Sequence, residues 1–278
     1  MKDILSEIIA HKRIELAEQM QMVPLEMLRE QAMNLTMSPC SMKQALAQST
    51  SGIIAEFKRR SPSKGWIKQD ADASAIPASY AAAGASALSI LTDDRYFGGR
   101  LRDIRQARPL VSIPILRKEF IIHEYQLLQA KIVGANAILL IASCLTKEEC
   151  SALTHQAHLL GLEVLLEIHS EEELGYVLPE TDMVGVNNRH LGTFVTEVST
   201  SFQLADRLQA HIRELQKTHP SMEMPVLVSE SGLSDPGTVR ELRAAGFRGF
   251  LMGEAFMKTS SPAETLHRFV QAVNSPDK

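Results

Sequence analysis

An acid and a base stand two residues apart in the apolar segment Ile53–Lys58, where few charges would be expected. With the alternation of a β-strand, Glu56 and Lys58 point to one side together with Ile54. Burying one charge alone is costly, whereas two opposite charges side by side partly neutralise each other. The pair is either a structural ion pair at the end of a strand or part of a site that moves protons.

Further polar residues stand at the ends of other short apolar runs along the chain. If these runs are parallel strands of a barrel, their carboxyl ends meet at one mouth, where burial and neighbouring charges shift pKa values. The alternative is a ring of salt bridges at the rim of the fold. The residues concerned are Lys118, Glu167, Asn187, Arg189, Glu230 and Glu254.

Two small turns near the C-terminus could bind an anion. Ser231-Gly232 and Gly253-Glu254 each follow an apolar run, at the place where many barrels bind phosphate through backbone N–H groups. Glycine lets a phosphate approach the backbone closely, although ordinary tight turns have the same composition. The Glu254 carboxylate would repel a phosphate, so we expect it to point away and to offer only its backbone N–H.

The histidines and cysteines do not predict a metal centre. His155 and His158 lie three apart on an expected helix without an evident third ligand, and the cysteines lack the spacing of a zinc site. We therefore expect no metal and no cofactor. His169 follows an expected strand on the same side as Glu167, and the sequence leaves open whether it belongs to the site.

The elements that must position these residues alternate between strand and helix from residue 53 onward. Apolar runs indicate the strands, 3.6-residue patterns indicate the helices, and glycines stand where several helices should end. The expected strands are Ile53–Lys58, Ala87–Leu91, Ile115–Lys118, Ala137–Ile141, Val164–Glu167, Val184–Asn187, Val226–Ser229 and Phe250–Met252. The expected helices are Ala73–Ala83, Leu101–Ala107, Glu124–Val133, Lys147–Leu160, Glu171–Val177, Phe202–Leu215, Pro236–Ala245 and Pro262–Val273.

Eight such units in a chain of 278 residues predict an α/β fold, a (β/α)8 TIM barrel, as a single domain over residues 1–278. An open doubly wound sheet is the alternative, but no GxGxxG motif follows the first strand. Residues 1–50 predict an N-terminal helical extension, in which Pro24 starts a second helix and Pro39 leads toward the first strand. The apolar residues of its first helix are Ile4, Leu5, Ile8, Ile9, Ile14 and Leu16.

Composition and charge argue against several classes of protein. The net charge of −4 is unlike that of a nucleic-acid-binding protein. No apolar run approaches the ~18 residues of a membrane span, and Asp3 and Glu7 interrupt the pattern of a signal peptide. The three cysteines have no disulfide-framework spacing, which fits a reducing compartment. We expect a cytoplasmic protein that binds neither nucleic acid nor membrane.

Several segments, in this order and spacing, resemble the indole-3-glycerol phosphate synthase family of tryptophan biosynthesis. They are IIAEFKRRSPSKG, ILRKEF, LLEIHS, VGVNNRHL, VSESGL and FLMGEAFM. The resemblance runs from the first expected strand to the last, and residues 1–50 resemble the helical extension that covers the barrel mouth in that family. It implies a carbon–carbon lyase, a carboxy-lyase. The implied reaction converts 1-(2-carboxyphenylamino)-1-deoxy-D-ribulose 5-phosphate to indole-3-glycerol phosphate by ring closure, decarboxylation and dehydration.

The resemblance also implies roles for individual residues. Lys118 is implied to protonate the ribulose carbonyl, and Glu167 to be the acid/base partner in the dehydration. Glu56 and Lys58 are implied to position both groups, with Lys58 near the substrate carboxylate, although the step served by each lysine and glutamate stays open. The implied substrate-binding residues are Ser61, Leu91, Phe120, Asn187, Arg189, Glu230, Ser231, Gly232, Gly253 and Glu254, of which Leu91 and Phe120 would sandwich the aromatic ring.

The sequence departs from the common family pattern at two positions. Glu119 stands where Asp is frequent and Glu254 where Ser often stands.

Two other functions would fit the same residues. One is another phosphosugar barrel enzyme, such as an isomerase or a Schiff-base aldolase using Lys118, and the other is a non-catalytic barrel that binds a phosphorylated ligand. The expected partner is a small phosphorylated substrate, with the chain a monomer or weak homodimer.

Overall fold

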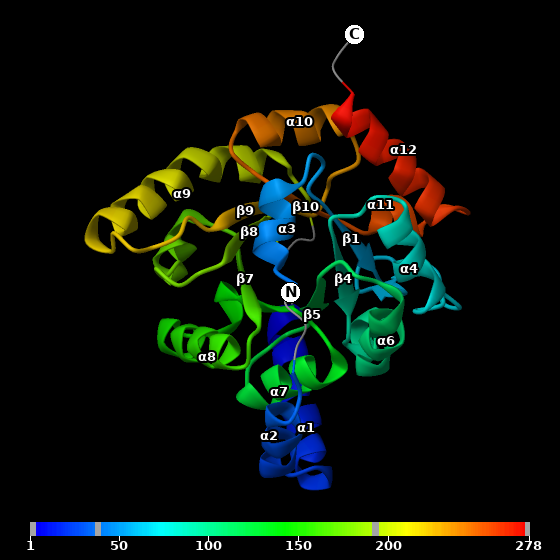
Figure 1. Cartoon of the computed structure of the whole chain (residues 1–278), viewed down its shortest axis with the longest axis vertical. Coiled ribbons are helices and arrows are strands. Elements are labelled where there is room, and N and C mark those ends of the chain that lie inside the picture. Colours follow the sequence, from blue (N-terminus) through cyan, green and yellow to red (C-terminus); the bar gives the residue numbers. More distant parts are fainter. Residues whose placement is uncertain (1–3, 37–39, 191–194, 276–278) are drawn as a thin grey trace.

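The computed structural model describes residues 4–36, 40–190 and 195–275, which form a closed barrel of parallel strands surrounded by helices (Figure 1). Pro39 and both ends of the expected domain, 1–278, lie outside the described residues. Neighbouring strands follow the chain order, and the first pairs with the last, so the predicted fold class is confirmed. The barrel strands are β1 (Ile53–Phe57), β4 (Ala87–Leu91), β5 (Ile115–Lys118), β6 (Ala137–Ile141), β7 (Glu163–Ile168), β8 (Met183–Asn187), β9 (Val226–Glu230) and β10 (Gly249–Met252).

Helices connect the strands on the outside of the barrel, close to the predicted ranges. They are α4 (Ala75–Ala82), α6 (Leu101–Ala107), α7 (Glu124–Val133), α8 (Lys147–Leu159), α9 (Ser199–Thr218), α10 (Pro236–Ala244) and α12 (Pro262–Asn274). The expected helix Glu171–Val177 is instead a 3₁₀ helix, η3 (Glu171–Tyr176), because Gly175 weakens a helix in this short segment. None of the described helices combines the length and the apolar character that crossing a membrane requires.

Several short elements of the structure were not predicted from the sequence. They are the hairpin of β2 (Arg60–Ser61) and β3 (Gly65–Trp66), α5 (Asp94–Phe97), α11 (Glu254–Met257), η1 (Arg108–Leu110) and η2 (Ala142–Cys144). Each is too short to have a recognisable hydrophobic period. α5 carries a local signal, since the Asp93 carboxylate caps it by accepting a hydrogen bond from the Tyr96 N–H.

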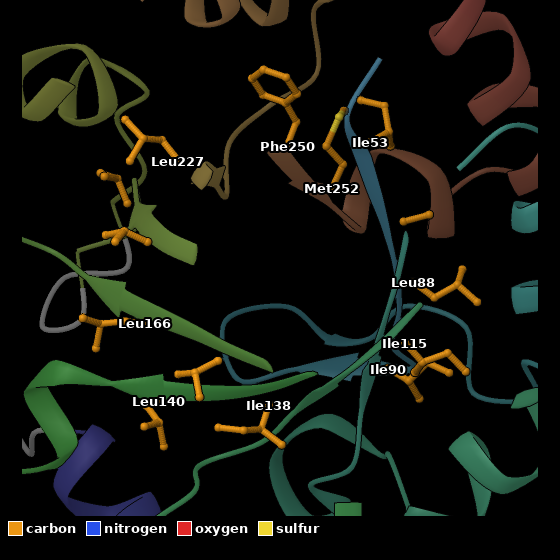
Figure 2. Close-up of a cluster of buried hydrophobic side chains, with 14 of the residues drawn as sticks. Ile53, Leu88, Ile90, Ile115, Ile138, Leu140, Leu166, Leu227, Phe250 and Met252 are labelled. Carbon is orange, nitrogen blue, oxygen red and sulfur yellow. The ribbon is translucent and has the colours of Figure 1, made fainter. Parts of the chain in front are cut away.

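The alternation of side chains along the strands gives two separate cores. Outward-facing residues pack against the surrounding helices, and Figure 2 shows Ile53, Leu140 and Phe250 among those around the outside of the strands. Inward-facing residues, such as Ile54 and Leu165, fill the barrel itself. Glu56 and Lys58 share the inward side with Ile54, as their spacing predicts.

The helix α1 (Ile4–Met22) buries Leu5, Ile8 and Leu16. Its apolar pattern also suggested a buried side chain at Ile14, which the structure does not show. Ile14 is 59% exposed, whereas Lys12 is only 2% exposed. The prediction that Ile14 lies on the packed side is therefore wrong. A lysine takes the buried position because carboxylates from the barrel surround it.

The other N-terminal helices do not lie with α1 at the mouth. The helix α2 (Leu25–Met33) packs against α7 on the outside of the barrel. The helix α3 (Met42–Gln48) lies across the centre of the barrel in Figure 1, and its Met42 and Leu46 join the inner core. The carboxylate of Glu163, at the start of β7, accepts hydrogen bonds from the Met42 and Lys43 N–H groups. Because strand starts lie at the end opposite the mouth, the prediction that residues 1–50 cover the mouth is wrong for α3, and it is wrong for α2, which lies on the outside of the barrel.

Candidate active site

A cavity of about 540 Å³ lies at the carboxyl ends of the barrel strands. It is lined by residues at or next to the ends of all eight barrel strands, and by the first two turns of α1. Most of the predicted catalytic and substrate-binding residues meet here, although they are far apart in the chain. Those lining the cavity are Glu56, Lys58, Leu91, Lys118, Phe120, Glu167, Asn187, Arg189, Glu230, Ser231, Gly232, Gly253 and Glu254.

Two ion-paired groups occupy the floor of this cavity. The Lys118 ammonium lies 3.1 Å from Glu167 Oε2 and 3.4 Å from Glu230 Oε2. Beside it, the Lys58 ammonium lies 2.7 Å from Glu56 Oε1. Strand order explains this arrangement, because β5, β7, β9 and β1 all bring their last inward-facing positions to the same level.

Burial and mutual attraction separate the protonation states of these groups. Burial favours the neutral amine of Lys118, but Glu167, Glu230 and Glu56 outweigh it and raise its pKa above the usual value. Burial likewise opposes the charge on Glu167 and on Glu56. The nearby lysines, Lys118 for the first and Lys58 for the second, nevertheless lower both pKa values. At neutral pH the site therefore holds the Lys118 ammonium near the ionised carboxylates of Glu167 and Glu56.

Glu230 differs from the other carboxylates. Burial raises its pKa to about 8, and the negative charge of Glu167 adds to this effect against the attraction of Lys118. Gly185 on β8 provides the room for this side chain, because a Cβ there would lie 2.1 Å from Glu230 Oε1. Glu230 thus keeps a proton at neutral pH, next to the ammonium of Lys118.

The residues after β8 face the cavity in a fixed turn. The Arg189 N–H donates to Asn187 Oδ1 over 3.0 Å, and Arg189 pairs with Thr196 in an antiparallel bridge. Asn187 also bonds the Glu167 carboxylate and lowers its pKa. The neighbouring Asn188 faces away and bonds the Ser201 and Ser229 hydroxyls. The strand alternation thus directs Asn187 and Arg189 to the cavity.

The turn after β9 has an unusual backbone. Ser231 has φ of 69° and Gly232 has φ of 78°, so both lie in the left-handed region, which is rare for serine. At Gly232 a Cβ would lie 2.6 Å from the Thr196 side chain. This strain at the cavity is typical of a ligand-binding turn whose N–H groups point toward an anion.

Gly253, after β10, has a second use that the sequence did not reveal. A Cβ at this position would lie 2.4 Å from Glu56 Oε1. Gly253 therefore makes room for the Glu56 carboxylate as well as opening the turn to a ligand. The adjacent Glu254 carboxylate lies 2.5 Å from the Lys64 ammonium, which offsets its charge at the cavity rim.

Ser61 does not lie where the resemblance placed it. It is buried in the strand β2 and does not line the cavity, whereas the next residues of the same loop, Pro62, Ser63 and Lys64, do. The hairpin explains this, because pairing of Ser61 with Gly65 turns the intervening loop toward the cavity instead.

Aromatic and cationic residues that the sequence analysis missed complete the lining. Phe97 of α5 lies 6.1 Å from Phe120, measured between ring centroids, and both face the cavity with Leu91. Lys258, after α11, adds a cation near the two glycine turns. Spacing gave no signal for either residue, since Phe97 ends α5 and Lys258 follows α11, and both helices are too short to predict.

Comparisons with known proteins agree with one another over nearly the whole chain. A family model described as indole-3-glycerol phosphate synthase matches residues 5–269. A Bacteroides thetaiotaomicron protein named indole-3-glycerol phosphate synthase is 61% identical over 273 residues, which cover 98% of this chain and 100% of that protein. A protein of the same name from Burkholderia ambifaria is 39% identical over 271 residues, which cover 96% of this chain and 99% of that protein.

Solved structures give a more distant likeness. A mutant tryptophan synthase alpha-subunit from Pyrococcus furiosus matches with a TM-score of 0.57 and 17% identity, over 80% of this chain and 97% of that one. Another tryptophan synthase structure from the same organism has a TM-score of 0.57 and 15% identity, again over 80% of this chain and 97% of that one. At such identities the likeness supports the barrel fold alone.

Proposed function

The chain belongs to the indole-3-glycerol phosphate synthase family, decarboxylating carbon–carbon lyases of tryptophan biosynthesis, and from this premise we propose how its own cavity performs the reaction. The substrate is 1-(2-carboxyphenylamino)-1-deoxy-D-ribulose 5-phosphate. Its aromatic ring, carboxylate and phosphate match an apolar wall, a lysine and an anion-binding turn in the cavity. The observation that carries the proposal is the Lys118 ammonium, held 3.1 Å from Glu167 and 3.4 Å from Glu230.

Lys118 is the general acid for ring closure. The aromatic carbon that bears the carboxylate attacks the ribulose carbonyl carbon, and negative charge develops on the carbonyl oxygen. An ammonium placed there lowers the barrier and donates the proton that makes the hydroxyl group. The neighbouring carboxylates raise the pKa of Lys118, so the ammonium that this step needs is present at neutral pH.

Decarboxylation and dehydration follow without an electron-accepting cofactor. The iminium formed by ring closure takes the electrons of the breaking carbon–carbon bond as CO2 leaves. The hydroxyl group then departs as water with a proton from a lysine, and a base removes a proton from the carbon beside nitrogen. Glu167 is the base in this proposal, because its lowered pKa keeps it ionised and Lys118 lies beside it.

The remaining residues hold the substrate. Lys58 receives the carboxylate, with Glu56 fixing its ammonium at 2.7 Å. Leu91 and Phe120, with Phe97, form the wall for the aromatic ring. The phosphate binds at the turns that contain Ser231, Gly232 and Gly253, while Asn187 and Arg189 orient the ribulose chain.

A Schiff-base aldolase is the chief alternative, and the electrostatics of the site argue against it. A Schiff base needs a neutral amine, which usually requires a lowered lysine pKa. Here carboxylates raise the pKa of Lys118 instead. The charged state suits proton donation and not nucleophilic attack.

Borohydride trapping separates the two chemistries. With the carboxyphenylamino-ribulose phosphate and borohydride, the proposal predicts no covalent adduct at Lys118 by mass spectrometry. An adduct at that residue would contradict the acid role. Lys217, an exposed lysine paired with Glu214 on α9, serves as the internal control for non-specific labelling.

A further inference from the structure

The ammonium of Lys12 is buried beside the cavity, and the reaction outlined above does not use it. Lys12 is 2% exposed and is not among the residues that line the cavity. Its Nζ lies 3.0 Å from Asp93 Oδ2 and 3.2 Å from Glu119 Oε1. Asp93 belongs to the loop after β4, and Glu119 to the loop after β5. One cation from α1 therefore joins two loops at the mouth of the barrel.

The first of these carboxylates holds the helix that carries Phe97. Asp93 Oδ1 accepts a hydrogen bond from the Tyr96 N–H over 2.7 Å and so caps α5, whose last residue is Phe97. The other oxygen, Oδ2, faces Lys12, and no other cation pairs with Asp93 among the residues that the structure describes. The place of the Phe97 ring therefore depends on the Lys12 ammonium through the cap of α5.

The second carboxylate holds the backbone of Phe120. Glu119 Oε1 accepts a hydrogen bond from the Phe120 N–H over 2.9 Å, and this is the oxygen that faces Lys12. The other oxygen, Oε2, accepts a hydrogen bond from the Thr92 hydroxyl over 2.9 Å and lies 3.7 Å from the Arg117 guanidinium. Lys12 is thus paired with the very oxygen that fixes Phe120.

We propose that Lys12 is a positioning residue that sets the shape of the aromatic wall of the cavity. It holds two like-charged carboxylates beside each other, and each of them holds one phenylalanine of the wall. The two rings, Phe97 and Phe120, lie 6.1 Å apart between centroids and both line the cavity. The inference rests on the proposed function, in which this wall receives the 2-carboxyphenylamino group of the substrate.

Electrostatic repulsion is the reason that the wall needs this cation. Asp93 and Glu119 are 1% and 3% exposed, so water screens their charges little. Burial opposes the charge of Lys12, but Glu119 and Asp93 outweigh it and raise its pKa above the usual value. Without the ammonium the two carboxylates repel each other, and each one displaces the backbone that it holds.

The effect should be confined to one end of the substrate. The proposed phosphate turns, at Ser231 and Gly232 and at Gly253, follow β9 and β10, and neither of them contains a partner of Lys12. Loss of Lys12 should therefore weaken binding of the aromatic end and leave binding of the phosphate end nearly as it was. A general loosening of the barrel would weaken both.

Competition against the carboxyphenylamino-ribulose phosphate measures the two ends separately. The competitors are 2-aminobenzoate for the aromatic end and inorganic phosphate for the other, with the product measured by chromatography. We expect Lys12→Met, assayed at a temperature where it is folded, to raise the inhibition constant of 2-aminobenzoate by about tenfold. The inhibition constant of phosphate should change by less than about twofold, and KM should rise with that of 2-aminobenzoate.

A second variant decides the matter if Lys12→Met does not fold. In Asp93→Asn the amide oxygen can still cap α5, and no buried carboxylate loses its cation, but the charge that Lys12 holds is gone. We expect the inhibition constant of 2-aminobenzoate to rise by about threefold, again without a matching change for phosphate.

The matched control is Tyr96→Phe. The Tyr96 hydroxyl donates to Glu7 Oε1 over 3.2 Å, which is another contact between α1 and α5. The substitution removes this contact and keeps the backbone N–H that Asp93 accepts. Both inhibition constants should stay within about twofold of wild type, because the Lys12 cluster is intact.

Equal rises of both inhibition constants in Lys12→Met would overturn the positioning role, and so would a rise in Tyr96→Phe as large as that in Asp93→Asn. The wild-type protein separates this inference from the proposed function. If wild type forms no indole-3-glycerol phosphate, both fail together. If wild type turns over normally and neither Lys12→Met nor Asp93→Asn weakens the binding of 2-aminobenzoate, only the role of Lys12 fails.

Discussion

At the scale of single residues, the glutamates of the cavity differ in protonation state because their neighbours differ. Glu56 and Glu167 each lie beside a lysine, and their pKa values fall despite burial. Glu230 shares Lys118 with Glu167 and, as the less favoured partner, keeps its proton. The site therefore contains ionised carboxylates and a neutral acid within reach of one ammonium, as proton-transfer chemistry at neutral pH requires.

The state of Glu230 gives a stability that depends on pH. Its pKa is raised from 4.5 to about 8, so between these values the folded protein holds a proton that the unfolded chain has lost. This contribution to stability is complete below pH 4.5 and is lost as pH rises toward 8. Glutamine has no such proton. Urea unfolding should show Glu230→Gln gaining stability relative to wild type across this window, and a difference independent of pH would contradict the assignment.

Strand alternation was enough to predict which charged residues meet, but not what glycines do beside them. Period two placed Glu56 and Lys58 on one side of their strand, the position at a strand end placed Lys118 at the same mouth, and the structure puts all three in one cavity. Gly185 and Gly253 make room for Glu230 and Glu56, which come from other strands. No local pattern encodes that, because the need for a glycine is created by a side chain distant in the sequence.

At the scale of elements, the placement of α1 depends on one buried lysine. The Lys12 ammonium lies 2.7 Å from Glu15, 3.0 Å from Asp93 and 3.2 Å from Glu119. Glu119 directly follows Lys118 and accepts the Phe120 N–H over 2.9 Å. Lys12 therefore fixes α1 to the loops that follow β4 and β5, beside the catalytic lysine.

Replacing Lys12 should destabilise the protein strongly. In Lys12→Met, Asp93 and Glu119 would stay buried without their shared cation, which costs about 3–5 kcal/mol in comparable sites. Arg13→Met, at an exposed position of the same helix, is the control and should change little. Urea denaturation measures both. Equal stability of the two variants would show that the buried cluster does not hold α1.

The elements found from the sequence are the apolar strands of the barrel and the helices that are long enough to show an amphipathic pattern. Predicted and observed bounds agree for β4, β5, β6, α6 and α7. The misses are short or depend on distant partners: α5 and α11 have a single turn, and the buried face of α1 includes Lys12 because of Asp93 and Glu119. Local sequence cannot show which charge a helix will meet.

At the scale of the whole molecule, the two ends of the barrel separate activity from stability. The cavity occupies the end where the strands finish, and α3 closes the end where they start. The repeated strand–helix pattern made the barrel predictable. The position of α3 was not, because its apolar residues fit the bottom of the barrel as well as the mouth.

Replacing Glu163 tests whether the two ends of the barrel separate activity from stability. Its carboxylate accepts hydrogen bonds from the Met42 and Lys43 N–H groups at the start of α3. Glu163→Gln weakens these charge-assisted bonds and should cost about 1–2 kcal/mol in unfolding experiments, with kcat unchanged. The control is Glu223→Gln, which breaks only an exposed pair with Lys43 and should be nearly neutral. A fall in kcat for Glu163→Gln at a temperature where it is folded would contradict the separation.

The measurement that tests the account most directly is the rise of indole fluorescence when the carboxyphenylamino-ribulose phosphate is added to wild-type protein and to Lys118→Met. We predict indole-3-glycerol phosphate formation by wild type, and a kcat lower by at least about 10²-fold in the variant, which still binds the substrate because its other contacts remain. Lys217→Met is the matched control and should behave as wild type. Near-normal turnover by Lys118→Met would contradict the central claim that this ammonium drives ring closure.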